Sequence, residues 1–292
     1  MRDSILSGSG LLFAALLLQP VSLQRETWVE FLIATAAWII VPWGLKRFLS
    51  TPIASWQWIM PTLLSIAFAL PAQWSNGILA LPWLGWSLWL VARHSRFNRP
   101  ATTFFSTALL FWAVAAAWAV AHVSAWHAFG FPPIIVLLTA AHFHYAGFAL
   151  MLITALAYRR FPSLRLKLLG YFIVGSTAAV ALAISAARFI KSAEIEAIPG
   201  IAMAAAGAGV AIFHMRKAAG QNQLTAWCWR VGSTLLLFGM LLAATYAMRS
   251  FAILPSLSIP KMYAWHGSLN ALALLLILIG WTLNKKGQNE NF

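Results

Sequence analysis

The sharpest chemical motif of the chain is a pair of histidines followed by a tyrosine, His142, His144 and Tyr145, inside an apolar stretch. Ionisable side chains are costly in hydrocarbon, so they mark a candidate functional site. Residues two apart on an α-helix point about 200° apart, so the two imidazoles cannot readily bind one metal together. Imidazole and phenol groups can exchange protons with a substrate. We therefore expect acid/base chemistry, with interhelical hydrogen bonding as the alternative role.

A second polar cluster lies near the C-terminus, where His266 and Asn270 are four residues apart and share one helix face. Tyr263, three residues before His266, extends the same polar stripe. Trp265 is typical of a residue that anchors a helix at the membrane interface. We predict that His266 acts as an acid or base, and that Asn270 binds a substrate or orients an imidazole.

Glu30 is the only acidic residue inside a predicted membrane span. Either its carboxylate reaches the outer interface, or it partners a histidine on the same side as a general base or an orienting group. His122 and His127 lie near the same outer level, where they can also be interfacial. His94 and His214 adjoin basic residues at the cytoplasmic helix ends, and we expect both to be solvated.

These polar residues stand in a chain that is overwhelmingly apolar. Of its 292 residues, 61% are hydrophobic and 9% are charged, whereas a soluble domain usually has about 25% charged residues. A soluble globular protein is therefore excluded. The net charge of +14 does not indicate a nucleic-acid partner, because basic residues in short loops between spans report topology and attraction to anionic lipid. The single cysteine, Cys228, excludes an internal disulfide and a multi-cysteine metal site.

Membrane-spanning helices must position the candidate residues, and each crossing takes roughly 20 apolar residues. We predict an all-α transmembrane bundle of about ten spans, forming a single integral membrane domain over residues 1–292. The approximate spans are 6–24, 28–45, 53–72, 76–93, 102–124, 132–158, 166–188, 198–215, 227–247 and 262–283. The first is expected to be a retained span rather than a signal peptide, because no clear cleavage site follows it.

Basic residues collect in alternate connections of this arrangement. About 15 of the 20 Lys and Arg residues fall on one side of the membrane. Because basic loops favour the cytoplasm, we predict that both termini are cytoplasmic. The expected location is the bacterial cytoplasmic (inner) membrane, crossed several times. In this orientation the candidate polar residues gather in the outer half of the bundle and near its middle.

The motifs carry a resemblance to a known family. The run HFHYAGF at residues 142–148 and the run HGSLNA at 266–271 resemble the YndJ-like family of bacterial integral membrane proteins. The resemblance implies a polytopic helical fold and two candidate positions, and no particular reaction. The run AHFHY at residues 141–145 also looks like the haem-ligating stretch of cytochrome oxidase subunit I, although the chain has no adjacent His-His pair for copper. A haem- or metal-binding protein therefore stays as a further alternative, and no cofactor or metal ligand is assigned.

We expect a polar pocket lined by the spans 28–45, 102–124, 132–158 and 262–283, with proton-transfer chemistry on an apolar lipid or isoprenoid that enters from the bilayer. Three histidines would act as acid or base, namely His142, His144 and His266. Three other side chains would bind the substrate or orient imidazoles, namely Tyr145, Asn270 and Glu30. The alternatives are a proton-coupled transporter that uses the same histidines, and a structural subunit in which they only pack the bundle.

Overall fold

A computed structural model describes residues 25–50, 54–251 and 257–284. The regular structure of this described part is helical throughout, with no β-strand, which confirms the all-α prediction. The predicted span 6–24, and with it the question of its retention, lies outside the described residues. The helices form two compact units. The first unit comprises the described residues up to Ser95 and Leu109–His144, and the second unit comprises Arg96–Ala108 and the described residues from Tyr145 onward.

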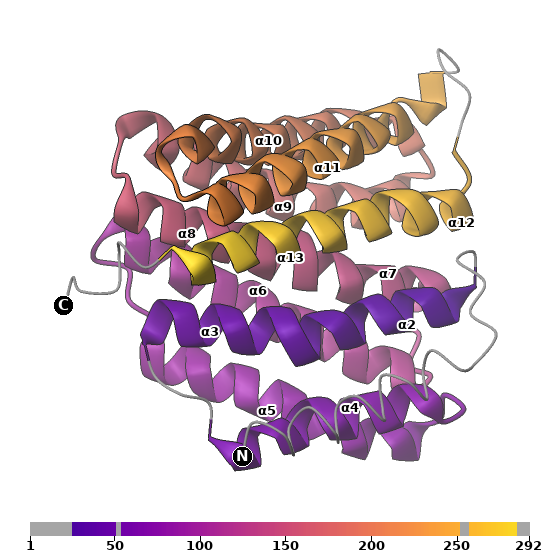
Figure 1. Cartoon of the computed structure of the whole chain (residues 1–292). Helices are drawn as coiled ribbons and strands as arrows, with labels where there is room; N and C mark the ends of the chain where they lie inside the picture. The colour runs from indigo at the N-terminus through magenta and orange to yellow at the C-terminus, as the bar shows by residue number, and fades with distance from the viewer. Residues whose placement is uncertain (1–24, 51–53, 252–256, 285–292) are drawn as a thin grey trace. The chain divides into compact units, whose positions relative to one another are not determined.

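The first unit is built on a long helix that runs through α2 (Glu26–Thr35), the π-helical turn η1 (Ala36–Ile40) and α3 (Val41–Leu49) (Figure 1). Pro42 explains the π-helical turn, because it has no N–H for the carbonyl of Trp38 and its ring crowds that carbonyl. Within this unit α2 packs against α4 and α7, and α4 packs against α5. The remaining elements are η2 (Ser55–Trp58), α4 (Ile59–Ala69), η3 (Trp74–Asn76), α5 (Gly77–His94), the second half of α6 (Pro100–Val123), η4 (Ala128–Gly130) and α7 (Pro133–His142).

In the second unit α11 lies side by side with both α10 and α13 (Figure 1). Glycines allow this approach: a Cβ on Gly207 would lie 2.3 Å from Met240 Sδ, and one on Gly232 would lie 2.8 Å from the Ala273 carbonyl oxygen. Small residues are the usual means of close helix packing in lipid. After the π-helical segment η5 (Phe143–Ala149), the elements are α8 (Leu150–Arg160), α9 (Leu164–Ile190), η6 (Ala193–Glu196), α10 (Ala197–Lys217), η7 (Ala218–Gly220), α11 (Gln223–Ala247), η8 (Arg249–Phe251), α12 (Ile259–Lys261), η9 (Met262–Gly267) and α13 (Ser268–Leu283).

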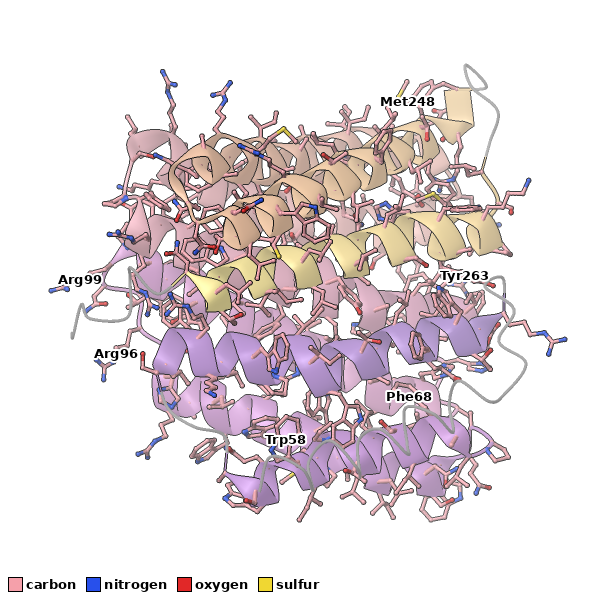
Figure 2. The ribbon with its side chains drawn as sticks, in the orientation of Figure 1. Trp58, Phe68, Arg96, Arg99, Met248 and Tyr263 are labelled. Carbon is pink, nitrogen blue, oxygen red and sulfur yellow. The ribbon has the colours of Figure 1, made fainter. Side chains whose placement is uncertain are left out.

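Basic residues of the second unit gather where helices end. Figure 2 shows Arg96 and Arg99 at one end of this unit and Tyr263 at the other. The connections α8–α9 and α10–α11 meet at a common end, since Arg160 and Lys217 line one pocket. The basic connections α8–α9 and α10–α11 therefore lie at the same end of the second unit, as the charge pattern predicts. The side of the membrane that this end faces stays a prediction.

Seven helices in the described part of the chain are long and apolar enough to cross a membrane. They are Glu26–Leu49, Pro100–Val123, Pro133–Arg160, Leu164–Ile190, Glu194–Gly220, Gln223–Ala247 and Ile259–Leu283. The expected spans 53–72 and 76–93 correspond instead to α4, with 11 residues, and α5, with 18 residues. A helix the size of α4 is about 16 Å long, short of a hydrocarbon core of about 30 Å. About ten spans are therefore not confirmed, and the single domain and the cytoplasmic termini stay predictions.

Candidate functional site

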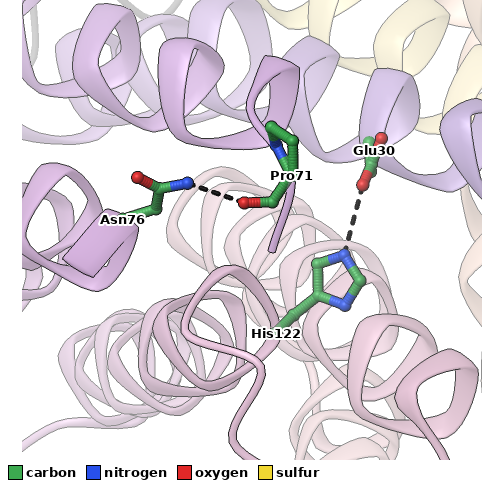
Figure 3. A network of polar contacts seen from close by, with 4 residues as sticks. All are labelled: Glu30, Pro71, Asn76 and His122. Atoms are coloured by element: carbon green, nitrogen blue, oxygen red, sulfur yellow. Dashed lines mark hydrogen bonds and ion pairs between the residues drawn. The ribbon is translucent and has the colours of Figure 1, made fainter. Parts of the chain in front are cut away.

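Glu30 and His122 form a buried polar pair in the first unit. Glu30 lies on α2 and His122 on the last turn of α6, with Oε1 of Glu30 3.2 Å from Nε2 of His122 (Figure 3). Only 8% of the His122 side chain and 17% of the Glu30 side chain are exposed. An ionised carboxylate can only accept hydrogen bonds, so the imidazole donates to it through Nε2–H. The carboxylate thereby fixes which ring nitrogen carries the proton.

The other ring nitrogen of His122 is free. Nδ1 is buried and has no hydrogen-bond partner among the residues that the structure describes. With the proton on Nε2, Nδ1 of a neutral imidazole holds a lone pair. A buried acceptor without a partner costs about 1–3 kcal/mol, so this nitrogen suits a ligand or a proton. An imidazole held by a carboxylate at one nitrogen, with a lone pair at the other, is the arrangement of a general base.

The connection between α4 and α5 is fixed against the end of α6, beside this pair. The backbone N–H of Gln73 donates to the carbonyl of the last α6 residue at 2.9 Å. Asn76 Nδ2 donates to the Pro71 carbonyl at 2.7 Å, which closes the connection on itself (Figure 3). The ring of Phe68, at the end of α4, has its centroid 6.1 Å from that of His122. The ends of α4 and α6 and the connection between α4 and α5 therefore pack together beside His122.

The helix that carries His122 ends in a strained cap. The N–H of Ala125 donates to the His122 carbonyl at 3.0 Å, and the N–H of Trp126 donates to the Ala121 carbonyl at 2.9 Å. This is the Schellman arrangement, whose left-handed position is usually glycine. Here the position is Ala125, with φ 52°. A left-handed non-glycine residue costs roughly 1–2 kcal/mol, and such strain often occurs at functional sites.

His144 is engaged at both ring nitrogens. It is completely buried, its Nδ1 lies 2.8 Å from the Ala140 carbonyl, and its Nε2 accepts from Trp83 Nε1 at 3.2 Å. A carbonyl can only accept and an indole N–H can only donate, so these partners assign a neutral ring with its proton on Nδ1. Trp83 also packs edge-on against Trp86 and Trp112. His144 thus has no free lone pair in this arrangement.

His266 and Asn270 contact each other, as their spacing predicts. Asn270 Nδ2 lies 3.0 Å from His266 Nε2, and His266 Nδ1 lies 2.7 Å from the Gly239 carbonyl on α11. The ring is therefore again neutral with its proton on Nδ1, and Nε2 accepts from the amide. Gly239 is needed for this approach, because a Cβ there would lie 2.2 Å from Asn270 Oδ1. The cluster joins α11 to the last helix.

The expectation that His214 is solvated is wrong. His214 is completely buried, its Nδ1 lies 2.9 Å from the Val210 carbonyl, and its Nε2 accepts from Trp281 Nε1 at 3.1 Å. Its ring also meets Trp229 edge-on at 5.4 Å. The neighbouring Arg216 and Lys217 are exposed. His214, in contrast, contacts Trp229 on α11 and Trp281 on α13. The result repeats the hydrogen-bonding pattern of His144.

The remaining predicted residues are His142 and Tyr145. His142 is half-buried at the end of α7, and Tyr145 is 7% exposed and belongs to the second unit. The predicted lining residues are divided between the units, with Glu30 and His144 in the first and His266 in the second. A single pocket shared by all of them stays a prediction, as do their roles in acid/base chemistry.

Each histidine motif overlaps a π-helical segment, which the apolar pattern of the sequence does not predict. η5 covers Phe143–Ala149 and η9 covers Met262–Gly267. The angle of about 200° between His142 and His144 assumes α-helical geometry, but His142 ends α7 and His144 lies in η5. π-Helical turns are rare and frequently occur at functional sites. Apolar periodicity over such short segments gives no signal for them.

Metal and haem ligation need donor atoms, such as imidazole nitrogen, carboxylate oxygen or thiolate sulfur, with free lone pairs. In the described residues no group of three or more His, Cys, Asp or Glu side chains could hold a metal ion. A haem bound by His144 would need Nε2, which instead accepts from Trp83. The residues around His144 therefore do not fit a haem ligand in this arrangement.

Comparison with known proteins gives one family and one curated relative. The family model described as YndJ-like protein matches residues 11–274. An uncharacterized membrane protein YndJ from Bacillus subtilis (strain 168) is 27% identical over 193 residues, which cover 65% of this chain and 34% of the relative. The chain thus spans about a third of the length of this relative. No solved structure matches the chain.

Proposed function

This chain belongs to the YndJ-like family of integral membrane proteins, and we propose that it is a membrane-embedded acid/base catalyst whose base is His122, oriented by Glu30. One observation carries the proposal. Nδ1 of His122 is buried without a hydrogen-bond partner among the described residues, while Nε2 faces the Glu30 carboxylate. A base of this kind takes a proton at Nδ1, and the carboxylate stabilises the resulting imidazolium.

The other predicted residues have different roles in this proposal. His144 and His266 already use both ring nitrogens, so they hold helices together and exchange no proton in this arrangement. Asn270 positions His266 through Nδ2, and its Oδ1, buried without a partner among the described residues, stays a candidate for substrate binding. His142 and Tyr145 stay candidates for substrate binding. The reactive role thus moves from the two histidine motifs to Glu30 within α2 and His122 on the last turn of α6.

The proposed substrate is an apolar lipid or isoprenoid with a reacting polar group. Exposed apolar side chains occur on the segments next to the Glu30–His122 pair, with exposed fractions of 79% for Trp74, 65% for Trp126 and 72% for Phe129. Exposed aromatic rings are typical of the interface between hydrocarbon and headgroups. A lipid whose polar group lies at that interface would bring it level with His122.

The proposal also includes a topology. The protein lies in the bacterial cytoplasmic membrane with about ten spans and both termini in the cytoplasm, as a single membrane domain. The basic connections of the second unit then face the cytoplasm. The Glu30–His122 pair, at the opposite end of its helices from Lys46 and Arg47, faces the other side.

The test compares lipid extracts of cells that carry the wild-type chain, no chain, or the variants His122→Gln and Glu30→Gln. His127→Gln is the matched control, because His127 is exposed in the connection that follows α6. We expect the same accumulating precursor in the deletion strain and in both site variants, and none in the control. The amount of each variant in membrane extracts is measured, so that a lower protein level is not mistaken for a lower catalytic activity.

Two results would oppose the proposal. If a precursor accumulates in the deletion strain but not in a well-expressed His122→Gln strain, His122 is not needed for the reaction. Unchanged lipids in all strains, together with proton-driven uptake in proteoliposomes that His122→Gln abolishes, would favour the transporter, in which the same pair carries the proton.

A further inference from the structure

The connection between α6 and α7, residues 124–132, exposes large aromatic side chains. Trp126 is 65% exposed and Phe129 is 72% exposed. Trp74 in η3 is 79% exposed and lies at the same end of the first unit, because the N–H of its neighbour Gln73 donates to the carbonyl of the last α6 residue at 2.9 Å. We call these three side chains the aromatic surface. Exposed rings that gather in one place indicate a partner.

The backbone of this connection is fixed by turns that follow the cap at Ala125. The N–H of Ala128 donates to the Trp126 carbonyl at 2.9 Å, across His127 with φ −79° and ψ 70°, which is an inverse γ-turn. Phe129 is left-handed, with φ 54°, a conformation that a bulky residue rarely adopts. Such strain persists only where the surrounding structure enforces it. The turns therefore present the Trp126 and Phe129 rings in a fixed geometry.

Helix length places this connection at the edge of the hydrocarbon core. α6 has 24 residues and the span Pro133–Arg160 has 28, which correspond to lengths of about 36 Å and about 42 Å. A core about 30 Å thick therefore leaves about 3–6 Å of each helix outside it at each end, when the helix is centred. The headgroup region is about 5–8 Å deep on each side. The backbone of the connection therefore lies among the headgroups, from which aromatic rings can reach the hydrocarbon.

The two ends of α6 differ in charge. Residues 124–132 contain no Asp, Glu, Lys or Arg, and neither do residues 70–77 around Trp74. The connection at the other end of α6 carries Arg96 and Arg99. Cations favour anionic headgroups and water, whereas tryptophan is enriched where headgroups meet hydrocarbon. An uncharged aromatic surface therefore matches this boundary rather than a charged partner.

We propose that the aromatic surface inserts into the bilayer, with the rings of Trp74, Trp126 and Phe129 in the boundary between headgroups and hydrocarbon. The insertion holds the end of α6 at a fixed depth, because the cap at Ala125 joins the connection to the turn that carries His122. The partner is the boundary of the acyl chains rather than a particular headgroup, so insertion is independent of lipid charge and of salt. This contact goes beyond the proposed reaction and needs no proton transfer at His122.

The experiment measures the depth of nitroxide labels on introduced cysteines of the full-length protein, reconstituted in phosphatidylcholine vesicles. Labels at Trp126→Cys and Phe129→Cys report on the aromatic surface. Asn98→Cys is the matched control, because Asn98 is exposed in the basic connection at the other end of α6. The native Cys228 is 3% exposed, and the wild-type chain checks that it takes no label. Collisions with oxygen, which prefers hydrocarbon, and with a nickel chelate, which prefers water, give the depth.

We expect the labels at Trp126→Cys and Phe129→Cys to lie about 5–10 Å into the headgroup and acyl boundary, where oxygen collisions exceed nickel collisions. The reverse is expected at Asn98→Cys, and phosphatidylglycerol in the vesicles should leave all depths unchanged. In the background Trp126→Ser with Phe129→Ser, a label at Trp74→Cys should become several-fold more accessible to nickel. Phe97→Ser, at a residue that is 60% exposed in the basic connection, is the matched background and should not move this label.

Two results would overturn the proposal. Nickel collisions at Phe129→Cys as frequent as at Asn98→Cys would place the connection in water. Low collision rates with both reagents would show that protein, such as a second copy of the chain, covers the rings. Neither result decides the role of His122, which the lipid extracts test separately.

Discussion

Replacing Trp83 with Phe removes the indole N–H that pairs with Nε2 of the buried His144. The histidine then keeps an acceptor without a donor, at a cost of about 1–3 kcal/mol. The smaller ring also gives up apolar contact, which adds roughly 1 kcal/mol. We therefore expect Trp83→Phe to lower the free energy of unfolding by about 2–4 kcal/mol. Trp43→Phe is the control, because Trp43 is 41% exposed in the same unit, and it should have little effect.

A double-mutant cycle separates the hydrogen bond from general packing. His144→Leu alone leaves the Trp83 N–H buried without its acceptor, whereas the double variant removes both polar partners. We expect the double variant to be less destabilised than the sum of the single variants by about 1–3 kcal/mol. Thermal unfolding in a fixed detergent measures this, at roughly 2–4 °C per kcal/mol. Strictly additive losses, or an equal loss in Trp43→Phe, would refute the assignment of His144 as a structural hydrogen-bond acceptor.

Two further predictions concern backbone positions, and both are measured as changes in melting temperature. Gly239→Ala should destabilise the protein by about 1–3 kcal/mol, because the new Cβ would lie 2.2 Å from Asn270 Oδ1. The control is Gly175→Ala, which should be neutral or slightly stabilising because nothing lies within 4 Å of its new Cβ. Equal effects of the two would contradict the close packing of α11 on His266 and Asn270. Ala125→Gly should raise the free energy of unfolding by about 0.5–1 kcal/mol, because relief of the left-handed strain exceeds the effect of the added entropy of the unfolded chain. A loss of stability in this variant would argue against the strained cap.

The helical architecture could be predicted largely from the sequence, because apolar length determines which segments can cross a bilayer. The expected span 132–158 corresponds to the continuous helix Pro133–Arg160. The expected span 53–72 is not confirmed, because residues 55–58 form a short 3₁₀ turn and α4 ends at Ala69. Hydropathy averaged over a window cannot detect such a break. A prediction from averaged hydropathy therefore does not include local backbone geometry such as the π-helical segments.

The candidate site was predicted only in part. The contact of His266 with Asn270 follows from their spacing on one helix face. The partner of Glu30 could be narrowed to an outer-side histidine, but His122 is 92 residues away in the chain, and no local pattern selects it. His214 was misjudged because its basic neighbours describe the helix end, whereas tertiary packing decides which face is buried. Contacts between helices, rather than helix type, set the state of each imidazole.

The most direct test of the proposed base is nitrogen NMR of the full-length protein in lipid nanodiscs with ¹⁵N-labelled histidine, in which each ring is assigned by its His→Gln variant. We predict that neutral His122 carries its proton on Nε2, and that Glu30→Gln changes its signals. We also predict that His144, His214 and His266 carry their protons on Nδ1, with no change in that variant. A proton on Nδ1 of neutral His122, or His122 signals that ignore Glu30→Gln, would contradict the central claim that Glu30 prepares His122 as a base.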